Sequence, residues 1–413
     1  MCGILAYYKK NGITRNDLKV LVSAVDAMRH RGPDGAGVVL FNTRENSFWR
    51  IAVQDHPEDL PIDIESQSYQ DGAADLFLGH RRLSIFDLSS NGHQPMRDSV
   101  GNFIVFNGEV YNFIELRAEL KQLGAQFHTG TDTEVILAAY RYWGGDCLKR
   151  FIGMWSFLLY DVENNLVFVS NDRFGIKPLY FYSSDNYWVY ASEIKAIRQV
   201  VSDIMEYHFE NMRTFVNEGH IDFDDTTLYK NIYRFKQATY QLDDLDSLPK
   251  STFQSYWHFP LYVKKYSSIE TACNEFRQLF RDAVRLRMRS DVPWGTTLSG
   301  GLDSSAIVYT AHDLLKQKGK CDVINAFSAV FPGEDGDESA FVKIVQNDLK
   351  LSTSFINPLE EFSECDFEDF MAYQDLPVTS TATFAQWSVM KLVSKSSVKV
   401  LLDGQGGDEL FGG

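Results

Sequence analysis

Residues 295–315, "GTTLSGGLDSSAIVYTAHDLL", combine the end of an apolar strand, a pair of glycines and the start of a helix. The apolar face predicted for this helix consists of Ile307, Val308, Ala311, Leu314 and Leu315. A strand that leads through glycines into a helix N-terminus brings free backbone amides and the positive end of the helix dipole together. The stretch therefore predicts an anion site, to which Ser304 and Ser305 add hydroxyl donors.

The chain around this stretch alternates between helical patterns and short apolar runs. A long helical pattern covers 270–288, and apolar runs follow at 323–331 ("VINAFSAVF") and 398–404 ("VKVLLDG"). Such alternation is typical of a parallel sheet with crossover helices. Residues 269–413 are therefore expected to form an α/β domain.

The first 205 residues have a different pattern. Short strands rich in β-branched and aromatic residues alternate with turns, and helical patterns appear only at 15–29, 113–123 and 132–143. This predicts a layered α+β domain. Residues 206–268 are polar and rich in Asp and Tyr, and we expect them to form a connecting region.

Composition excludes several functions. The 413 residues suffice for two or three domains, and their formal charge of −16 disfavours nucleic acid and anionic lipid as partners. No signal peptide and no apolar run long enough to span a membrane is apparent. The five cysteines, at positions 2, 147, 273, 321 and 365, show no C-x-x-C spacing, which argues against a disulfide framework and a zinc site. A cytoplasmic location is expected.

The chain begins "MCGIL", so removal of Met1 would leave Cys2 with both a free α-amine and a thiol. An α-amine titrates near pH ~8 and a thiol near pH ~8.5, so the amine is a suitable base for the thiol of the same residue. Cys2 is therefore a candidate nucleophile, although a small residue that opens a strand would look the same.

Seven motifs follow Cys2 in order. They are "RHRGPDG" (29–35), "LGHRRLSIFDLSSNGHQPM" (78–96), "FNGEVYN" (106–112), "GTDTEVIL" (130–137), "GMWSFLLYD" (153–161), "DRFGIKPLYF" (172–181) and "ASEIKA" (191–196). Together they resemble the glutaminase domain of asparagine synthetases, a class II glutamine amidotransferase with an N-terminal nucleophile. The resemblance implies an Ntn-hydrolase sandwich of α+β class. The loops "RHRGPDG" and "RFGIKP" are assigned to packing around the active site.

The resemblance also implies roles for individual residues. Cys2 would attack the side-chain amide of glutamine, while Asn107 and the backbone of Gly108 would form the oxyanion hole. Arg82 would bind the α-carboxylate of glutamine, and the α-ammonium would be held by Glu109 and Asp132.

Each of these residues also has a structural alternative. Arg82 could be a surface arginine, Asp132 a helix N-cap, and Asn107 with Gly108 a turn. The occurrence of all the motifs in family order favours the functional interpretation.

"SGGLDSS" (299–305) lacks the Lys of a Walker A loop and resembles the PP-loop of ATP pyrophosphatases. The implied pyrophosphate site comprises Ser299, Gly300, Gly301, Asp303, Ser304 and Ser305. The adenosine pocket implied by the same resemblance is lined by Leu298, Val330 and Gly404. Asp303, together with Asp408 of "VKVLLDGQGGDELFGG" (398–413), would ligate Mg²⁺. ATP and Mg²⁺ are therefore the expected cofactors.

The whole resemblance implies an asparagine synthetase. Ammonia released from glutamine would displace AMP from an aspartyl adenylate formed in a PP-loop ATP pyrophosphatase domain, residues 269–413. Two departures keep alternatives open: Gln405 replaces a common Glu, and the chain stops at Gly413, so the second domain is expected to be incomplete at its C-terminal end. The alternatives are an amidotransferase for another carboxylate, such as a uronic acid of a polysaccharide or a peptide, and a non-catalytic relative. Expected partners are small-molecule substrates, with a homodimer as a further possibility.

Overall fold

The computed structural model describes residues 1–201, 206–221, 224–248, 250–261, 263–319, 323–360 and 363–411. Cys321 and the domain boundary expected at residue 205 lie outside these residues. The chain divides into two compact units, Met1–Pro260 and Leu261–Gly413.

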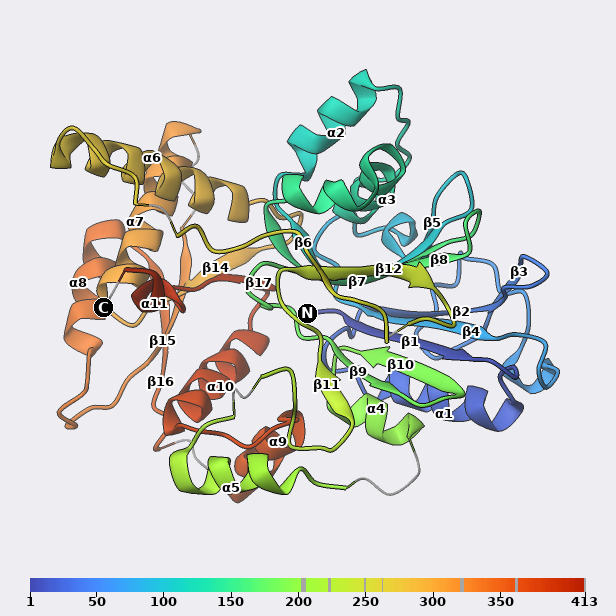
Figure 1. The fold of residues 1–413 in the computed structure, drawn as a ribbon. Helices are drawn as coiled ribbons and strands as arrows, with labels where there is room; N and C mark the ends of the chain where they lie inside the picture. Colours follow the sequence, from blue (N-terminus) through green and yellow to red (C-terminus); the bar gives the residue numbers. More distant parts are fainter. Residues whose placement is uncertain are drawn as a thin grey trace. The chain divides into compact units, whose positions relative to one another are not determined.

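The first unit is built on two antiparallel sheets (Figure 1). In order across the first sheet, the strands are β11 (Ile232–Arg234), β9 (Tyr180–Ser183), β10 (Tyr187–Ala191), β1 (Gly3–Lys9), β4 (Leu76–Arg82), β2 (Gly35–Asn42) and β3 (Ser47–Arg50). The second sheet has the order β13 (Gln254–Ser255), β12 (Thr239–Asp244), β8 (Leu166–Asn171), β7 (Gly153–Asp161), β6 (Phe103–Val110) and β5 (Met96–Arg97).

Side-chain alternation along the strands separates two apolar layers. On β6, Phe103 and Val105 join the core between the sheets, where they meet Ile4 and Ala6 of β1. Their neighbours on β6, such as Phe106, face the opposite way and join a second cluster with helices α2 (Phe113–Gln122) and α3 (Asp132–Trp143).

Helices cover the outer faces of both sheets. Helices α1 (Arg15–Asp26) and α4 (Ile194–Val200) pack on each other and on strands of the first sheet, and α3 packs on β6 of the second. The helices approach closely, since a Cβ at Gly79 of β4 would lie 2.5 Å from Val25 Cγ2 of α1. The predicted α+β sandwich is confirmed.

Local sequence sets where these helices begin. Thr14 and Asp17 form a capping box at α1, in which Asp17 N donates to Thr14 Oγ1 (3.1 Å) and Thr14 N donates to the Asp17 carboxylate (2.8 Å). At α3, Thr131 Oγ1 accepts from Glu134 N at 3.2 Å. The N-cap of α3 is therefore Thr131, and the interpretation of Asp132 as that cap is wrong.

The segment expected to connect the two domains contributes strands to both sheets. β11 pairs with β9, and β12 pairs with β8 and β13. The segment also holds helix α5 (Phe209–Glu218), which ends at Gly219 in a left-handed conformation, φ +71°. The polar composition of this segment reflects its position at the sheet edges.

The second unit is an α/β domain with a parallel sheet, as the alternating pattern predicts. Its strands lie in the order β16 (Ser352–Ile356), β15 (Asn325–Ala329), β14 (Trp294–Thr297) and β17 (Val400–Leu402), and all three pairings are parallel. Its helices are α6 (Ile269–Arg287), α7 (Leu302–Gln317), α8 (Ser339–Leu349), α9 (Glu364–Tyr373), α10 (Thr381–Ser394) and α11 (Gly407–Phe411). The core includes the predicted apolar face of α7, with Val308 and Ala311 buried.

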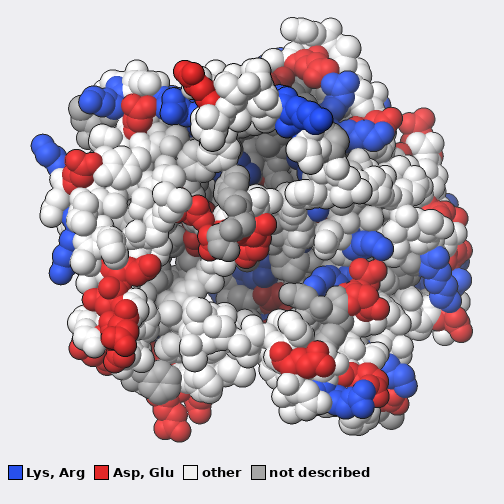
Figure 2. Space-filling view, turned by 60° about the vertical axis from the view of Figure 1, so that its left-hand side comes forward, with Lys and Arg blue, Asp and Glu red and all other residues white. Residues whose placement is uncertain are grey.

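Acidic and basic side chains are interspersed over the described residues of the face in Figure 2. Cys2, Cys147, Cys273 and Cys365 are free thiols. None of the described helices has both the length and the apolarity to cross a bilayer.

Leu158 on β7 is fully buried between the two sheets, whereas Leu123 at the end of α2 is 50% exposed. We expect Leu158→Ala to lower the free energy of unfolding of the first unit by about 2–5 kcal/mol, because it removes packed methyl groups and leaves a cavity. Leu123→Ala should change it by less than ~0.5 kcal/mol. Urea unfolding followed by far-UV circular dichroism measures both. Equal losses would contradict the two-sheet core.

Candidate functional site

Cys2 lies one residue before β1, in the middle of the first sheet. Its Sγ accepts a hydrogen bond from Leu83 N at 3.4 Å and lies 3.8 Å from Leu83 O. The Leu83 amide is held in turn, because the next amide, Ser84 N, donates to the carboxylate of Asp34 at 2.8 Å. Cys2 is half-buried.

The backbone of Cys2 is anchored by a buried ionic network. Arg31 Nε donates to the Cys2 carbonyl at 2.9 Å, and Arg31 Nη1 pairs with Glu193 at 3.1 Å. Glu193 also contacts His30 Nε2 at 2.8 Å. The motifs "RHRGPDG" and "ASEIKA" therefore meet behind Cys2. The sequence analysis named both motifs but neither Arg31 nor Glu193, because a side chain that holds a distant backbone carbonyl leaves no local pattern.

Alternation brings the other candidates to the same layer. Side chains an even number of positions apart along a strand point to the same face. Cys2 therefore faces the same way as Ile4 and Ala6, and Asn107 and Glu109 face the same way as Val105. All of them face the space between the sheets. The two sheets are tied together at this point, where His80 Nε2 contacts Phe106 O at 3.1 Å. The polar candidate residues thus lie in the same inter-sheet layer as the apolar core residues.

Asn107 is the least satisfied polar residue of this layer. Its side chain is 0% exposed, and neither Oδ1 nor Nδ2 has a hydrogen-bond partner among the described residues. Leaving such a group unpaired costs about 1–3 kcal/mol, so a buried orphan amide points to a ligand. Gly108 beside it cannot carry a side chain, because a Cβ would lie 2.2 Å from Met154 O of β7.

Arg82 is buried, and some of its N–H donors already form hydrogen bonds within the protein. Its guanidinium donates to the carbonyls of Ser89 (2.7 Å), Phe86 (3.2 Å) and Asp87. An arginine has five N–H donors, so these three bonds leave two for a ligand. The interpretation of Arg82 as a surface arginine is therefore wrong.

Two further candidates are buried acids. Glu109 is on β6, and Asp132 begins α3 and accepts a hydrogen bond from Val110 N at 2.9 Å. Burial, reinforced by the charge of Glu109, raises the pKa of Asp132 to about 7. A bound cation would relieve this unfavourable concentration of negative charge.

Two amines complete the cluster. Lys177, in the loop after β8, is buried within electrostatic range of Glu109, Arg31 and Cys2, and burial lowers the pKa of its ammonium. Burial also lowers the pKa of the Met1 amine to about 5. The Met1 amine is therefore largely unprotonated at neutral pH.

In the second unit, the predicted anion loop connects β14 to α7. Ser299 Oγ and Ser304 Oγ lie 3.0 Å apart, and Gly301 N donates to Ser299 Oγ at 3.2 Å, which closes the loop. Gly300 has φ +86°, and a Cβ there would lie 2.8 Å from Phe341 Cβ. Glycine is therefore required at this turn. Ser305 N donates to Gly301 O at 3.2 Å in the first turn of α7.

The other residues expected at the nucleotide site meet the same sheet edge. Leu298, Val330 and Gly404 follow the carboxyl ends of β14, β15 and β17, which are neighbouring parallel strands. Ligands of open α/β sheets bind at this edge. The two glycine loops also touch, since a Cβ at Gly404 would lie 3.0 Å from Ser304 N.

Asp303 and Asp408 belong to these two loops. A Cβ at Gly407 would lie 2.3 Å from Asp303 Oδ2, so the Asp303 carboxylate rests against the residue that precedes Asp408. Two carboxylates suit Mg²⁺ that takes its remaining ligands from phosphate and water. Within the described ranges, no group of three or more His, Cys, Asp or Glu residues could hold a metal by itself. Gln405, next to Gly404, donates its backbone N–H to Asp403 Oδ1 at 3.1 Å.

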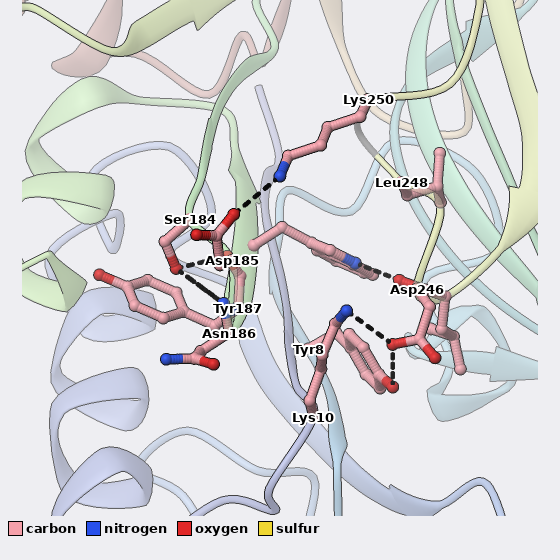
Figure 3. A pocket seen from close by; sticks show the side chains of 11 residues that line it. Tyr8, Lys10, Ser184, Asp185, Asn186, Tyr187, Asp246, Leu248 and Lys250 are labelled. Carbon is pink, nitrogen blue, oxygen red and sulfur yellow. Dashed lines mark hydrogen bonds and ion pairs between the residues drawn. The ribbon is translucent and has the colours of Figure 1, made fainter.

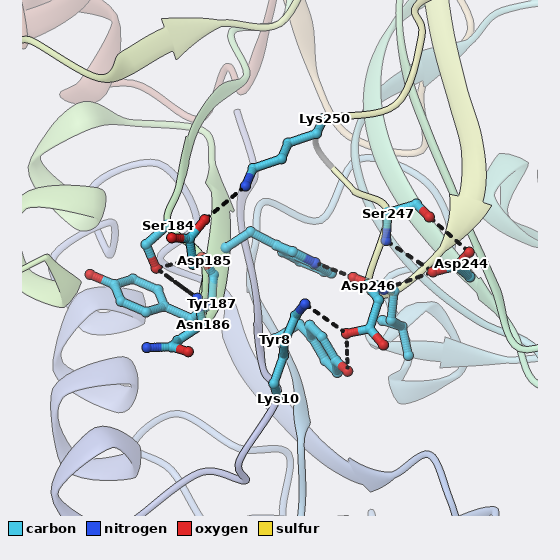
Figure 4. Close-up of polar contacts among 12 residues, drawn as sticks. Tyr8, Lys10, Ser184, Asp185, Asn186, Tyr187, Asp244, Asp246, Ser247 and Lys250 are labelled. Atoms are coloured by element: carbon cyan, nitrogen blue, oxygen red, sulfur yellow. Dashed lines mark hydrogen bonds and ion pairs between the residues drawn. The ribbon is translucent and has the colours of Figure 1, made fainter.

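A polar pocket of the first unit lies at the C-terminal end of β1 (Figure 3). Its charges pair with one another: Lys10 lies 3.5 Å from Asp246, and Lys250 lies 3.0 Å from Asp185. The neighbouring turn is also internally bonded, with Asp244 accepting from both Ser247 N and Oγ at 2.9 Å (Figure 4). Satisfied groups of this kind stabilise the fold rather than attract a ligand.

Comparison with known proteins gives matches over both units. A family model described as "Glutamine amidotransferase domain" matches residues 63–257, and one described as "Asparagine synthase" matches residues 275–413. A Methanocaldococcus jannaschii protein named among the glutamine-hydrolysing asparagine synthetases is 33% identical over 438 residues, covering 100% of this chain and 75% of that protein.

Two further relatives are more distant. Glutamine-hydrolysing asparagine synthetase 1 of Bacillus subtilis is 30% identical over 419 residues, and amidase chry2 of Gibberella zeae is 27% identical over 435 residues. Each comparison covers 100% of this chain and 59% of the relative, so the chain spans less than two thirds of the length of these two proteins.

The raised pKa of Asp132 predicts a pH-dependent stability. The folded state holds the proton more tightly than the unfolded state, so this residue's contribution to stability is lost as pH rises towards 7. Asp132→Asn keeps an acceptor for Val110 N without the charge. We expect its stability advantage over the unsubstituted protein to grow by about 2–3 kcal/mol from pH 5 to pH 8, measured by urea unfolding.

Asp87 provides a control of opposite sign. It is partly desolvated, but the hydrogen bonds it accepts from Ser89 and Gly130 N outweigh that and lower its pKa. Asp87→Asn should therefore gain no advantage at pH 8. If Asp132→Asn changes the free energy of unfolding equally at the two pH values, the fold does not disfavour the charged form of Asp132.

Proposed function

Because the chain belongs to the family of glutamine-hydrolysing asparagine synthetases, we propose that it releases ammonia from glutamine and uses it to amidate a carboxylate activated by ATP. The proposed domains are a glutaminase domain at 1–205, a connecting region at 206–268 and a synthetase domain at 269–413. Since the chain spans only part of its relatives, the activity of the whole protein is part of this proposal.

The observation that carries the glutaminase half is the orphan amide of Asn107. It is fully buried in the same layer as Cys2, and nothing in the described protein satisfies it. The tetrahedral intermediate of amide hydrolysis would supply the missing acceptor, since its oxyanion can receive hydrogen bonds from Asn107 and from the backbone of Gly108. An apolar residue would otherwise be more stable at this position.

The proposed first reaction uses the chain start. After removal of Met1, the α-amine of Cys2 takes the thiol proton, and sulfur attacks the side-chain carbonyl carbon of glutamine. The remaining donors of Arg82 bind the α-carboxylate, while Glu109 and Asp132 bind the α-ammonium. As the intermediate collapses, the amine returns its proton to the leaving nitrogen, so the C–N bond breaks and ammonia departs. Water then hydrolyses the thioester to glutamate and restores the thiol.

The proposed second reaction takes place at the carboxyl edge of the parallel sheet. The acceptor carboxylate attacks the α-phosphate of ATP and displaces pyrophosphate, which the amides and hydroxyls of 299–305 bind; Leu298, Val330 and Gly404 contact adenosine. Asp303 and Asp408 would hold Mg²⁺, which neutralises phosphate charge when bound. Ammonia then attacks the acyl carbon and displaces AMP.

The proposed acceptor is free aspartate, giving asparagine. A second acceptor class is favoured by two observations: a relative named as an amidase aligns over the whole chain, and Gln405 stands where a carboxylate is common in the family. The substrates are therefore glutamine, ATP and aspartate or another carboxylate. We also propose a cytoplasmic location, which suits the free cysteines, and a homodimer.

Cys2→Ala should abolish glutaminase activity. We expect glutamate release from glutamine to fall by at least ~10³-fold, because the nucleophile is lost. Amidation driven by added ammonium salt should persist, since the second reaction does not use Cys2. Cys273→Ala, at an exposed cysteine of the second unit, is the matched control and should leave glutamate release unchanged. Mass spectrometry should find mature chains that begin at residue 2; full activity in chains that retain Met1 would contradict the mechanism.

The acceptor is tested by ATP–pyrophosphate exchange in the full chain. Labelled pyrophosphate should enter ATP only when the correct acid is present, and Asp303→Asn should suppress this exchange. Aspartate-dependent exchange supports an asparagine synthetase. Exchange with a uronic acid or a peptide carboxylate instead would establish the second acceptor class. Exchange without dependence on any acid would remove the adenylation step from the proposal.

A further inference from the structure

Two loops supply the groups proposed to bind the α-carbon end of glutamine. Arg82, at the end of β4, is held by carbonyls of residues 86–89, and Asp132 begins α3 directly after residues 128–131. The carboxylate and the ammonium of an α-amino acid share one carbon, so the two protein groups can bind both of them only at a fixed spacing. Recognition of an α-amino acid therefore requires a link between these two loops.

The loop of residues 128–131 is held by the helices that flank it. Arg117 of α2 donates to the carbonyls of Thr129 (2.6 Å) and Thr131 (2.7 Å). Glu134 of α3 accepts a hydrogen bond from Thr129 N at 2.8 Å. This loop is therefore fixed to α2 and α3, and the spacing depends on the loop that follows β4.

Asp87 is bonded to both loops. Its carbonyl accepts from the guanidinium of Arg82, and its carboxylate Oδ2 accepts from Gly130 N at 2.8 Å. The other carboxylate oxygen accepts from Ser89 N at 3.3 Å and from Ser89 Oγ, which fixes the side chain. One residue therefore joins the arginine to the backbone two positions before Asp132.

Asp87 adopts a backbone conformation that few side chains allow. Its φ is +49°, in the left-handed region, where Asp is tolerated because its side chain can bond the local backbone. At Gly92 the chain returns to the guanidinium, since a Cβ there would lie 1.9 Å from Arg82 Nη2 and 2.9 Å from Asp87 O. The bond from Asp87 to Gly130 is exposed to solvent, so it adds little to the stability of the fold. A task at the site explains this strained turn better than stability does.

We propose that Asp87 is a positioning residue of the glutaminase site, which sets the spacing between Arg82 and Asp132 and so selects substrates that carry both an α-carboxylate and an α-ammonium. The inference rests on the proposed function. Asp87 acts through these two groups and does not itself bind glutamine. Its loss weakens binding of the ground state and of the transition state alike, which raises KM and leaves kcat nearly unchanged.

The test is steady-state glutamine hydrolysis by the full chain carrying Asp87→Gly. Glycine accepts the positive φ but has no carboxylate, so the substitution breaks the bond to Gly130 without straining the turn. We expect KM for glutamine to rise about 10-fold, the effect of one lost hydrogen bond to a charged group, and kcat to change by less than about 2-fold. Asp87→Asn keeps the acceptor and should keep KM within about 3-fold of the unsubstituted value.

Substrate specificity distinguishes a positioning role from a structural one. Glutaramate has the amide and the carboxylate of glutamine but no α-ammonium, so its binding does not require both protein groups at once. Its kcat/KM should change by less than about 2-fold in Asp87→Gly, so the preference for glutamine over glutaramate should fall by about 5- to 10-fold.

Asp98→Gly is the matched control. The Asp98 carboxylate accepts from the backbone amides of Val100, Gly101 and Asn102 at 2.8–3.0 Å, in the turn between β5 and β6. Its removal should leave both KM for glutamine and the preference over glutaramate unchanged.

The outcomes separate the two proposals. An unsubstituted protein that releases no glutamate would overturn the proposed function and this inference with it. If glutamate is released, but Asp87→Gly lowers kcat/KM equally for glutamine and glutaramate or leaves both unchanged, the inference alone is overturned. Loss of the cooperative urea transition in Asp87→Gly would likewise reduce Asp87 to a structural role.

Discussion

The alternation of side chains along the strands of two facing sheets is the constraint on which the candidate site between these sheets depends. The residues of β1, β4 and β6 that fill the core and those that form the candidate site share one parity along each strand. A slip of one residue in β6 would turn Asn107 and Glu109 towards α3. Their neighbours on β6, which now face the helices, would then point into the space between the sheets. The large apolar core therefore fixes the register that a few polar residues need.

That layer is unfavourable by itself. It holds an unpaired amide, two buried acids of which one has a strongly raised pKa, and a buried lysine. These groups persist because the surrounding sandwich is extensive and because the loops behind them are tied by Arg31, Asp34 and Asp172. Glutamine carries a carboxylate, an ammonium and an amide, and thus offers a partner for each kind of unsatisfied group. The unsatisfied polar and charged groups of the site therefore match the groups that its proposed substrate carries.

Much of this architecture was predictable from sequence. The parallel sheet followed from the alternation of apolar runs and helices after residue 269, and the sandwich followed from the motifs that resemble the family. Cys2 and Asn107 could be named as candidates because motifs preserve contiguous residues. Arg31, Glu193 and Lys177 were missed as individual residues because their significance depends on burial and on partners more than a hundred residues away or on another strand. The alternative that made Asp132 the cap of α3 was off by one residue, since Thr131 and Asp132 are both good caps in isolation.

The short strands β11, β12 and β13 have a consequence for how the molecule can be divided. They close an edge of each sheet, although they come from the polar stretch after residue 206. A first unit truncated before them would expose the buried strand β8 and the strand β9 as open edges, and unpaired edges of this kind promote aggregation. Excision of the first unit, or its fusion to another protein, therefore has to cut beyond the last of these strands, β13.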